Sequence, residues 1–295
     1  MSAEATVPPA RAAFAVYTAR MDACFARDAS GRPVLDLREL AAAGAPDLGA
    51  LPALTDAERA VAIRTWRGRM VNEHASAQVW ASLLPQLMRA AVPPVLLASA
   101  ASAASDELRH GVRCAAVVHA LGGEATAPLP DLPPLPAHED VGALEAALRN
   151  VLSVGCMSET VAVAVIRAEQ AELEGGPLGE VLAEILADEV AHARFGWAVL
   201  GALAPRLDDA ARARTDAYLV DAFAHQIRWE LPKLPVVAGR RPELAAAGVC
   251  DGGFAREVFF DTLRDVIVPG LEAAGLRAGA ALQRALDETL PHLES

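Results

Sequence analysis

The pentapeptide Asp-Glu-x-x-His occurs twice in this chain, as DELRH at residues 106–110 and as DEVAH at residues 188–192. Both copies lie in Ala- and Leu-rich stretches that are typical of helices. On a helix, a Glu and a His three positions apart lie on one face, so both side chains can point into the same interior. A carboxylate and an imidazole at this spacing form half of a divalent-metal site. A solvated charged face is the alternative interpretation, but it does not explain why both copies lie within apolar helices.

The composition favours helices packed closely on helices. Of the 295 residues, 53% are hydrophobic but only 4% are aromatic, so Ala, Leu and Val must fill the core. We find no alternation typical of strands and predict an all-α fold. The net charge of −12 argues against nucleic acid and an anionic membrane as partners. The four cysteines lack C-x-x-C spacing and no signal peptide is evident, so we expect free thiols and a cytoplasmic location.

Capping and breaking residues divide the chain into helices. TDAE at residues 55–58 is a capping box that begins a helix running to about residue 90. Further helices are predicted over about 94–121, 139–173, 178–203 and 208–231, with one or two more between 254 and 290; a Pro-rich connection spans residues 122–138. We therefore predict three parts: an irregular or helical N-terminal cover (1–54), a four-helix bundle (55–205) and C-terminal helices packed on it (206–295).

Two further glutamates complete the pattern of a di-metal site. Helix bundles of this kind combine two Glu-x-x-His helices with one Glu from each of two other helices. Glu73 and Glu159 are each a single carboxylate within a largely uncharged run. A buried carboxylate is costly unless it is neutral or bound to metal. Taken alone, each is also compatible with a chance carboxylate at a helix edge.

The spacing of these residues fits two helical hairpins. If Glu73 and Glu107 face each other, the turn should lie near residue 90, and AAVPPV breaks the chain there. If Glu159 and Glu189 face each other, the turn should lie near residue 174, where EGGPLG follows. The Pro-rich segment falls between the two halves, where such bundles have their single long crossover.

With this ordered set, the chain resembles the ferritin-like di-iron carboxylate superfamily over residues 55–205. The resemblance implies six iron ligands: Glu73, Glu107, His110, Glu159, Glu189 and His192. Asp106 and Asp188 match acids that, in oxygen-activating members such as the methane monooxygenase hydroxylase, bond a ligand histidine of the opposite half. Because a pseudo-two-fold axis would relate the halves, we predict that Asp106 pairs with His192 and Asp188 with His110.

Single positions distinguish the members of this superfamily. The ribonucleotide reductase small subunit has its radical tyrosine one turn after the first-half histidine, where this chain has Cys114. Bacterial hydroxylases often have a threonine where this chain has Val163, and arylamine N-oxygenases add a histidine where it has Ile185. Rubrerythrins share the two halves, but their rubredoxin cysteines are absent here.

The resemblance implies a non-haem di-iron oxygenase or oxidase that uses dioxygen to oxidise a small organic substrate. Two Fe ions are the expected cofactor, with Mn or a mixed Mn/Fe pair as alternatives. An electron-donor protein is the expected partner, and a homodimer is one assembly left open. The main alternative is a rubrerythrin-like peroxide scavenger or iron-handling protein without an organic substrate. A metal-free helical interaction module is a third possibility.

Two groups of residues in the sequence each have two possible interpretations. Gly155, with the small residues around it, either leaves space for substrate beside Glu159 or permits close helix packing. His225, Arg228 and Glu230 either line a substrate mouth or form a solvated helix face with Trp229 packed inward.

Overall fold

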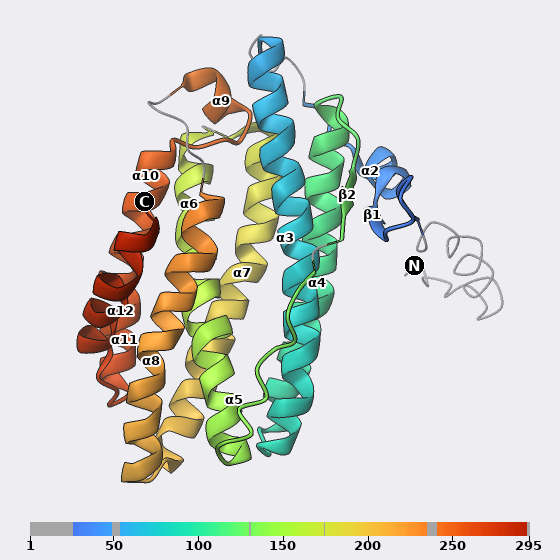
Figure 1. Ribbon diagram of the computed structural model, residues 1–295. Coiled ribbons are helices and arrows are strands. Elements are labelled where there is room, and N and C mark those ends of the chain that lie inside the picture. Colours follow the sequence, from blue (N-terminus) through green and yellow to red (C-terminus); the bar gives the residue numbers. More distant parts are fainter. Residues whose placement is uncertain (1–25, 49–53, 130, 174, 235–240, 294–295) are drawn as a thin grey trace, which may run out of the picture.

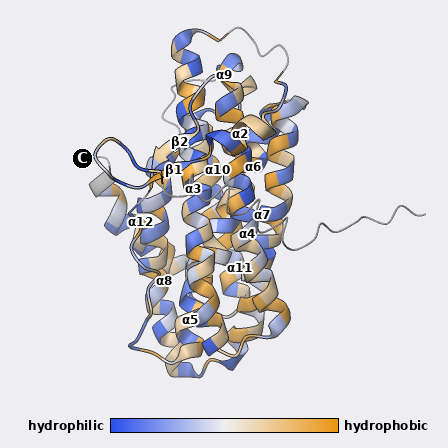
Figure 2. Cartoon of the chain, turned by 90° about the vertical axis from the view of Figure 1, so that its right-hand side faces the viewer, coloured by the Kyte–Doolittle hydropathy of each residue, from blue (hydrophilic) through white to orange (hydrophobic). Residues whose placement is uncertain are grey.

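The computed structural model describes residues 26–48, 54–129, 131–173, 175–234 and 241–293. The first 25 residues of the expected N-terminal cover, with Tyr17 and Cys24, lie outside the described part, as do residues 49–53. The rest is almost entirely helical, and the long helices run side by side along one axis (Figure 1). Hydrophilic and hydrophobic residues are interspersed along these helices (Figure 2), as expected for helices with one buried face.

The four expected bundle helices are present. They are α3 (Asp56–Arg89), α4 (Pro94–Ala120), the continuous run α5 (Ala143–Val151), η2 (Leu152–Ser158) and α6 (Glu159–Glu172), and α7 (Gly176–Leu203). α3 begins at the predicted capping box: the Thr55 side chain accepts from the Glu58 backbone N–H, and the Glu58 side chain accepts from the Thr55 N–H. α3 and α4 form one hairpin and α6 and α7 another.

The connection between the halves runs the length of the bundle (Figure 1). Two buried amides hold it in place: Asn150 Nδ2 and Gln86 Nε2 donate to the Pro136 carbonyl at 2.7 and 3.2 Å, and Asn150 Nδ2 also donates to Gln86 Oε1. The prediction of no strands is wrong here. Residues 126–128 of the connection (β2, Thr126–Pro128) pair antiparallel with β1 (Val34–Asp36). A three-residue strand is too short to show a period of two in the sequence.

A π-helical segment precedes the third-helix glutamate. The sequence predicted one regular helix over 139–173, but η2 has π-helical hydrogen bonding from Leu152 to Ser158. An extra residue in a turn rotates everything after it by about 100° relative to a regular helix. The segment therefore sets the face that Glu159, the next residue, presents to the bundle. A second π segment, η5 (Thr262–Ile267), interrupts the C-terminal helices.

η2 also approaches α7 closely through two glycines. A Cβ on Gly155 would lie 2.6 Å from the Gly196 Cα, and a Cβ on Gly196 would lie 2.3 Å from the Gly155 carbonyl carbon. No side chain fits between these backbones. Close packing is therefore the correct interpretation of Gly155, and it fixes the helix spacing near Glu159 and His192.

The remaining helices cover one side of the bundle (Figure 1). They are α8 (Asp209–Glu230), α9 (Pro242–Ala246), α10 (Gly252–Asp261), α11 (Val268–Ala273) and α12 (Ala278–Leu293), with short 3-10 turns η3 (Ala204–Arg206) and η4 (Leu231–Lys233). On the opposite side, α2 (Arg38–Gly44) packs on α4. Trp66, fully buried in α3, donates to the Ala247 carbonyl at 2.9 Å and so ties the C-terminal part to the bundle.

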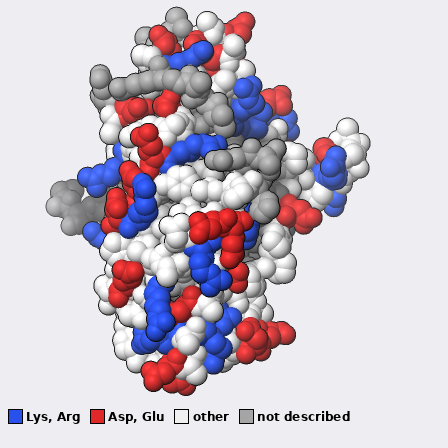
Figure 3. All heavy atoms as spheres, turned by 60° about the vertical axis from the view of Figure 1, so that its left-hand side comes forward, with Lys and Arg blue, Asp and Glu red and all other residues white. Residues whose placement is uncertain are grey.

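The run from Ala143 to Glu172 is long and apolar enough, by length and composition, to cross a membrane. Core helices of bundles meet the same criterion, and this one is a core helix that carries buried polar side chains. These are Glu145, Arg149, Asn150, Glu159, Thr160 and Glu169. Acidic and basic side chains are interspersed over the face seen in Figure 3, so the net negative charge does not gather into one patch there.

Candidate metal centre

The structure brings the six predicted ligand residues together in the middle of the bundle. All six are buried; they are Glu73 on α3, Glu107 and His110 on α4, Glu159 at the start of α6, and Glu189 and His192 on α7. They form two overlapping groups, Glu73 with Glu107, His110 and Glu189, and Glu107 with Glu159, Glu189 and His192. Within each group, one potential ligand atom from every residue lies within 4.8 Å of the others. Each group can hold one metal ion, so the site can hold a pair.

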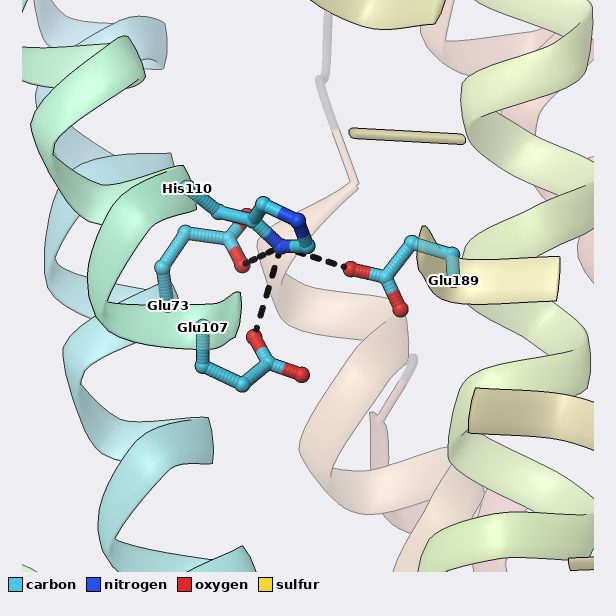
Figure 4. A group of neighbouring side chains, drawn as sticks. All are labelled: Glu73, Glu107, His110 and Glu189. Carbon is cyan, nitrogen blue, oxygen red and sulfur yellow. Dashed lines mark ion pairs between the residues drawn. The ribbon is translucent and has the colours of Figure 1, made fainter. Parts of the chain in front are cut away.

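Glu107 and Glu189 belong to both groups. Each directs one carboxylate oxygen to each histidine: Glu189 Oε1 is 3.2 Å from His110 Nδ1 and its Oε2 is 3.3 Å from His192 Nδ1. The Glu107 oxygens are 3.8 Å and 3.3 Å from the same two nitrogens. Figure 4 shows the first group converging on the His110 ring. These two glutamates are therefore placed to bridge a metal pair.

Glu73 and Glu159 lie at the two ends. Glu73 Oε2 is 3.7 Å from His110 Nδ1, and Glu159 Oε2 is 3.8 Å from His192 Nδ1. Each therefore faces one half of the site and is placed as a terminal ligand. The arrangement has the pseudo-two-fold symmetry that the duplicated sequence motif predicted.

The predicted pairing of each aspartate with the opposite histidine is confirmed. His110 Nε2 lies 3.1 Å from Asp188 Oδ2, and His192 Nε2 lies 3.3 Å from Asp106 Oδ2. An ionised carboxylate can only accept a hydrogen bond, so each Nε2 carries the hydrogen and donates it. Each Nδ1 is then left to face the carboxylates with a free lone pair, as a metal ligand requires.

Two residues at this site were not identified from the sequence. The Arg109 guanidinium donates to both aspartates, at 2.5 Å to Asp106 and 3.1 Å to Asp188, and so links the two halves. The equivalent position of the second copy is Ala191, so the repeat offered no signal for it. Trp80 Nε1 donates to Glu159 Oε1 at 3.1 Å. Its position two helical turns after Glu73, on the same face of α3, was the available signal.

The donor set fits divalent metal ions. Among the described residues, His110 Nδ1, His192 Nδ1 and Glu189 Oε2 are buried atoms without a hydrogen-bond partner. Buried polar atoms are normally paired, so three unpaired atoms that converge on one point indicate a missing ligand. Two divalent cations would also balance the charge of four glutamates with two neutral imidazoles. The metal-free interaction module leaves these atoms unexplained.

Protons occupy the centre when metal does not. Burial, with the charges of Glu107 and Glu189, raises the pKa of Glu73 to about 8. Burial and the same two charges raise the pKa of Glu159 well above its usual range. Burial lowers the pKa of His192, but the carboxylates of Glu107 and Glu189, each 3.3 Å from its Nδ1, outweigh this and raise it to about 10. Metal binding therefore displaces protons from this cluster.

Cys114 lies one helical turn after His110, fully buried in α4. Burial raises the pKa of its thiol, and the negative charge of Glu73 adds to the effect. The group is therefore a neutral thiol in the metal-free protein, and Cys114 belongs to neither of the two candidate ligand groups. Among the described residues, Cys114, Cys156 and Cys250 are all free cysteines.

A cavity of about 590 Å³ reaches the cluster from between α3, α6 and α7. All four glutamates of the centre line this cavity. Neither His110 nor His192 is among the described residues that line it. Trp229 also lines this cavity and is 42% exposed, so the interpretation in which Trp229 packs inward is wrong. The His225 ring stacks on Trp229 at a centroid distance of 6.1 Å.

Replacing Asp188 with alanine is expected to lower metal affinity by roughly 10- to 100-fold, the usual effect of removing a carboxylate behind a ligand histidine. The His110 ring would lose the partner that fixes its tautomer and orientation. Competition with a metal chelator measures the affinity, and circular dichroism checks the fold. Glu184→Ala is the control, because Glu184 lies one turn earlier on α7 and pairs only with exposed Arg113 among the described residues. Equal affinities in the two variants would contradict a role for Asp188.

No protein-family model matches this chain, and no curated protein matches it either.

Proposed function

We propose that this protein is a non-haem di-iron oxygenase or oxidase of the ferritin-like type, which activates dioxygen to oxidise a small organic molecule. The observation that carries the proposal is the joining of a six-ligand centre to a substrate-sized cavity. The histidines and their aspartates close one side of the centre, and the four glutamates open to the cavity on the other. Ligand pockets commonly have volumes of about 300–1,000 Å³.

Two ferrous ions held by these residues would supply the electrons that reduce dioxygen. The chain's own contribution is to hold and orient. Glu107 and Glu189 would help to hold both ions, and the Asp–His pairs keep each Nδ1 directed inward. Trp80 donates to Glu159 and fixes its position. Ala162, Val165, Ile166 and Ile185 form an apolar part of the cavity wall that would keep water from the reacting group.

A peroxide-scavenging or iron-handling protein needs no room for an organic substrate, so the cavity favours the oxygenase or oxidase. The proposal includes an electron-donor protein, because an oxygenase reduces dioxygen by four electrons, of which the organic substrate supplies two and the donor must supply the other two. It also includes a cytoplasmic location, for which the three free cysteines are the support.

The ferrous-loaded protein is expected to consume oxygen without forming a tyrosyl radical. Cys114 lies where a radical tyrosine would follow His110, and the described Tyr218 lies on α8, with its hydroxyl 3.1 Å from Ser153 Oγ. An oxygen electrode with a panel of organic compounds, together with electron paramagnetic resonance after mixing with oxygen, tests this. Uptake that depends on one compound supports the proposal.

Two outcomes would overturn parts of it. Fast peroxide turnover without any organic compound would establish the scavenger instead. A radical signal that disappears in Tyr218→Phe or Tyr17→Phe would show that a tyrosine is oxidised by the metal centre. Tyr218→Phe should otherwise leave oxygen uptake unchanged.

A further inference from the structure

The wall of the cavity carries an excess of positive charge once the metal ligands are set aside. Two divalent ions balance the four glutamates of the centre. The other charged lining residues are Arg64, Arg69 and Lys233, against a single carboxylate, Glu169. Glu230 lies outside the lining but accepts from Lys233 Nζ at 3.2 Å. Three cations against two carboxylates leave one positive charge without a counterion at the cavity.

Arg69 is held rigidly in this wall. It lies on α3 one helical turn before Glu73, about 6 Å away along the axis. Its Nη2 donates to buried Glu169 at 2.6 Å, and its guanidinium lies 4.4 Å from the centre of the Trp66 ring. Its buried Nη1 has no hydrogen-bond partner among the described residues. A guanidinium donor left unpaired in a protein interior is costly, and an anionic ligand would supply the missing acceptor once the side chains that cover Nη1 shift.

Lys233 places a second cation on the same side of the cavity. Its Nζ donates to Asn72 Oδ1 at 2.9 Å and lies 4.5 Å from the centre of the Trp229 ring. Asn72 follows Arg69 by three residues, so the two lie on one face of α3. Asn72 and Glu230 accept two of the three ammonium N–H bonds, and the third remains available to a ligand.

The wall between these cations and the metal centre is apolar. Ala162 lies one turn after Glu159 on α6, and Ile185 lies one turn before Glu189 on α7. Val165 and Ile166 continue this surface towards Glu169. A ligand held by its charged end at Arg69 and Lys233 would therefore extend an uncharged body along Ala162 and Ile185 to the glutamates.

We infer that the cavity binds a monoanionic organic acid, with its carboxylate between Arg69 and Lys233 and its apolar body directed at the metal centre. This inference rests on the proposed function, because it names the substrate class of the same cavity. A ligand carboxylate there would be a third anion beside the three cations Arg64, Arg69 and Lys233 of the wall, and the planar guanidinium matches a carboxylate in shape. Because Arg69 lies one helical turn before Glu73, the carbon that reacts at the metal centre would be several bonds away from the carboxylate of the ligand.

Straight-chain probes test the charge of the ligand without knowledge of the natural substrate. Calorimetric titration of the full chain compares carboxylates from butanoate to decanoate with the alcohols and amines of equal length. At about pH 7 the acids are anions and the amines cations. The best carboxylate is expected to bind roughly tenfold or more tightly than its alcohol and its amine, since a charge-assisted bond is about twice as strong as a neutral one.

Variants then test the two anchoring residues. Lys233→Met keeps the length of the side chain and removes its charge. Arg69→Gln is combined with Glu169→Gln, so that no unpaired charge is left in the wall. Each is expected to weaken carboxylate binding by roughly tenfold and to leave alcohol binding unchanged. The matched control is Arg113→Gln with Glu184→Gln, an exposed ion pair between the outer faces of α4 and α7, which should change neither.

Titrations with metal-loaded and metal-free protein separate this inference from the proposed function. A carboxylate held by Arg69 and Lys233 binds in both states and weakens in both variants. A carboxylate that binds only to metal-loaded protein, with the same affinity in the variants as in the wild type, is a metal ligand. That result overturns the inference. Equal binding of alcohols, or tighter binding of amines, overturns it as well. Failure of oxygen uptake with carboxylate binding intact would refute only the oxygenase or oxidase.

Discussion

Replacing Glu107 with alanine is expected to remove both metal ions from the purified protein. Glu107 directs one oxygen to each half of the centre, so its loss takes a ligand from both ions at once. Elemental analysis after loading with ferrous iron should find about two ions per chain in the wild type and close to none in the variant. Iron, manganese or a mixed pair would satisfy the ligand set equally, so the analysis should measure both metals.

Loss of metal in this variant should occur without loss of the fold. Raised pKa values keep Glu73 and Glu159 protonated when no cation is present, and the apolar core of the bundle is unchanged in the variant, so circular dichroism of the metal-free variant should still show the helical fold. His192→Ala is expected to lose metal in the same way, since His192 belongs to the second group. Glu184→Ala is the control with an exposed carboxylate removed. Full occupancy in Glu107→Ala or His192→Ala would refute the assignment of the centre.

Replacing Gly196 with alanine is expected to destabilise the protein by about 1–3 kcal/mol or more, the cost of forcing extra atoms into a packed interior. The added Cβ would lie 2.5 Å from the Gly155 carbonyl oxygen, and backbone atoms cannot rotate away as a side chain can. α7 and η2 would have to separate, which would also displace Glu159 relative to His192. Chemical denaturation of the metal-free protein measures the free energy of unfolding.

Gly201→Ala provides the matched control on the same helix. Gly201 is exposed, and a Cβ there would meet nothing within 4 Å. Alanine is favoured over glycine inside a helix by about 1 kcal/mol, so this variant should be as stable as the wild type or more stable. If Gly196→Ala were equally stable, the close approach of α7 and η2 would be wrong.

The sequence alone was sufficient to identify the six candidate ligand residues and the helices that hold them. Helical periodicity places Glu107 with His110, and Glu189 with His192, on single faces, and the breakers at Pro93 and Gly175 place the turns midway between paired carboxylates. These are local properties of the chain, because spacing along a helix determines direction and depth. The duplicated Asp also allowed the cross-pairing with the opposite histidines to be predicted, since a repeated half implies an axis between the copies.

The tertiary structure alone decided which unrepeated residues complete the site. Arg109 links the two aspartates, Trp80 bonds Glu159, and Arg69 pairs with Glu169 across the cavity. Apart from the Arg109–Asp106 bond within α4, each contact joins helices far apart in the sequence, and periodicity indicates which face a residue is on but not what faces it. The π segment before Glu159 has no sequence signature either. Its backbone hydrogen bonding is less favourable than that of an α-helix, and packing against α7 stabilises it. The local pattern therefore determines the ligands, whereas the relative placement of helices determines what surrounds them.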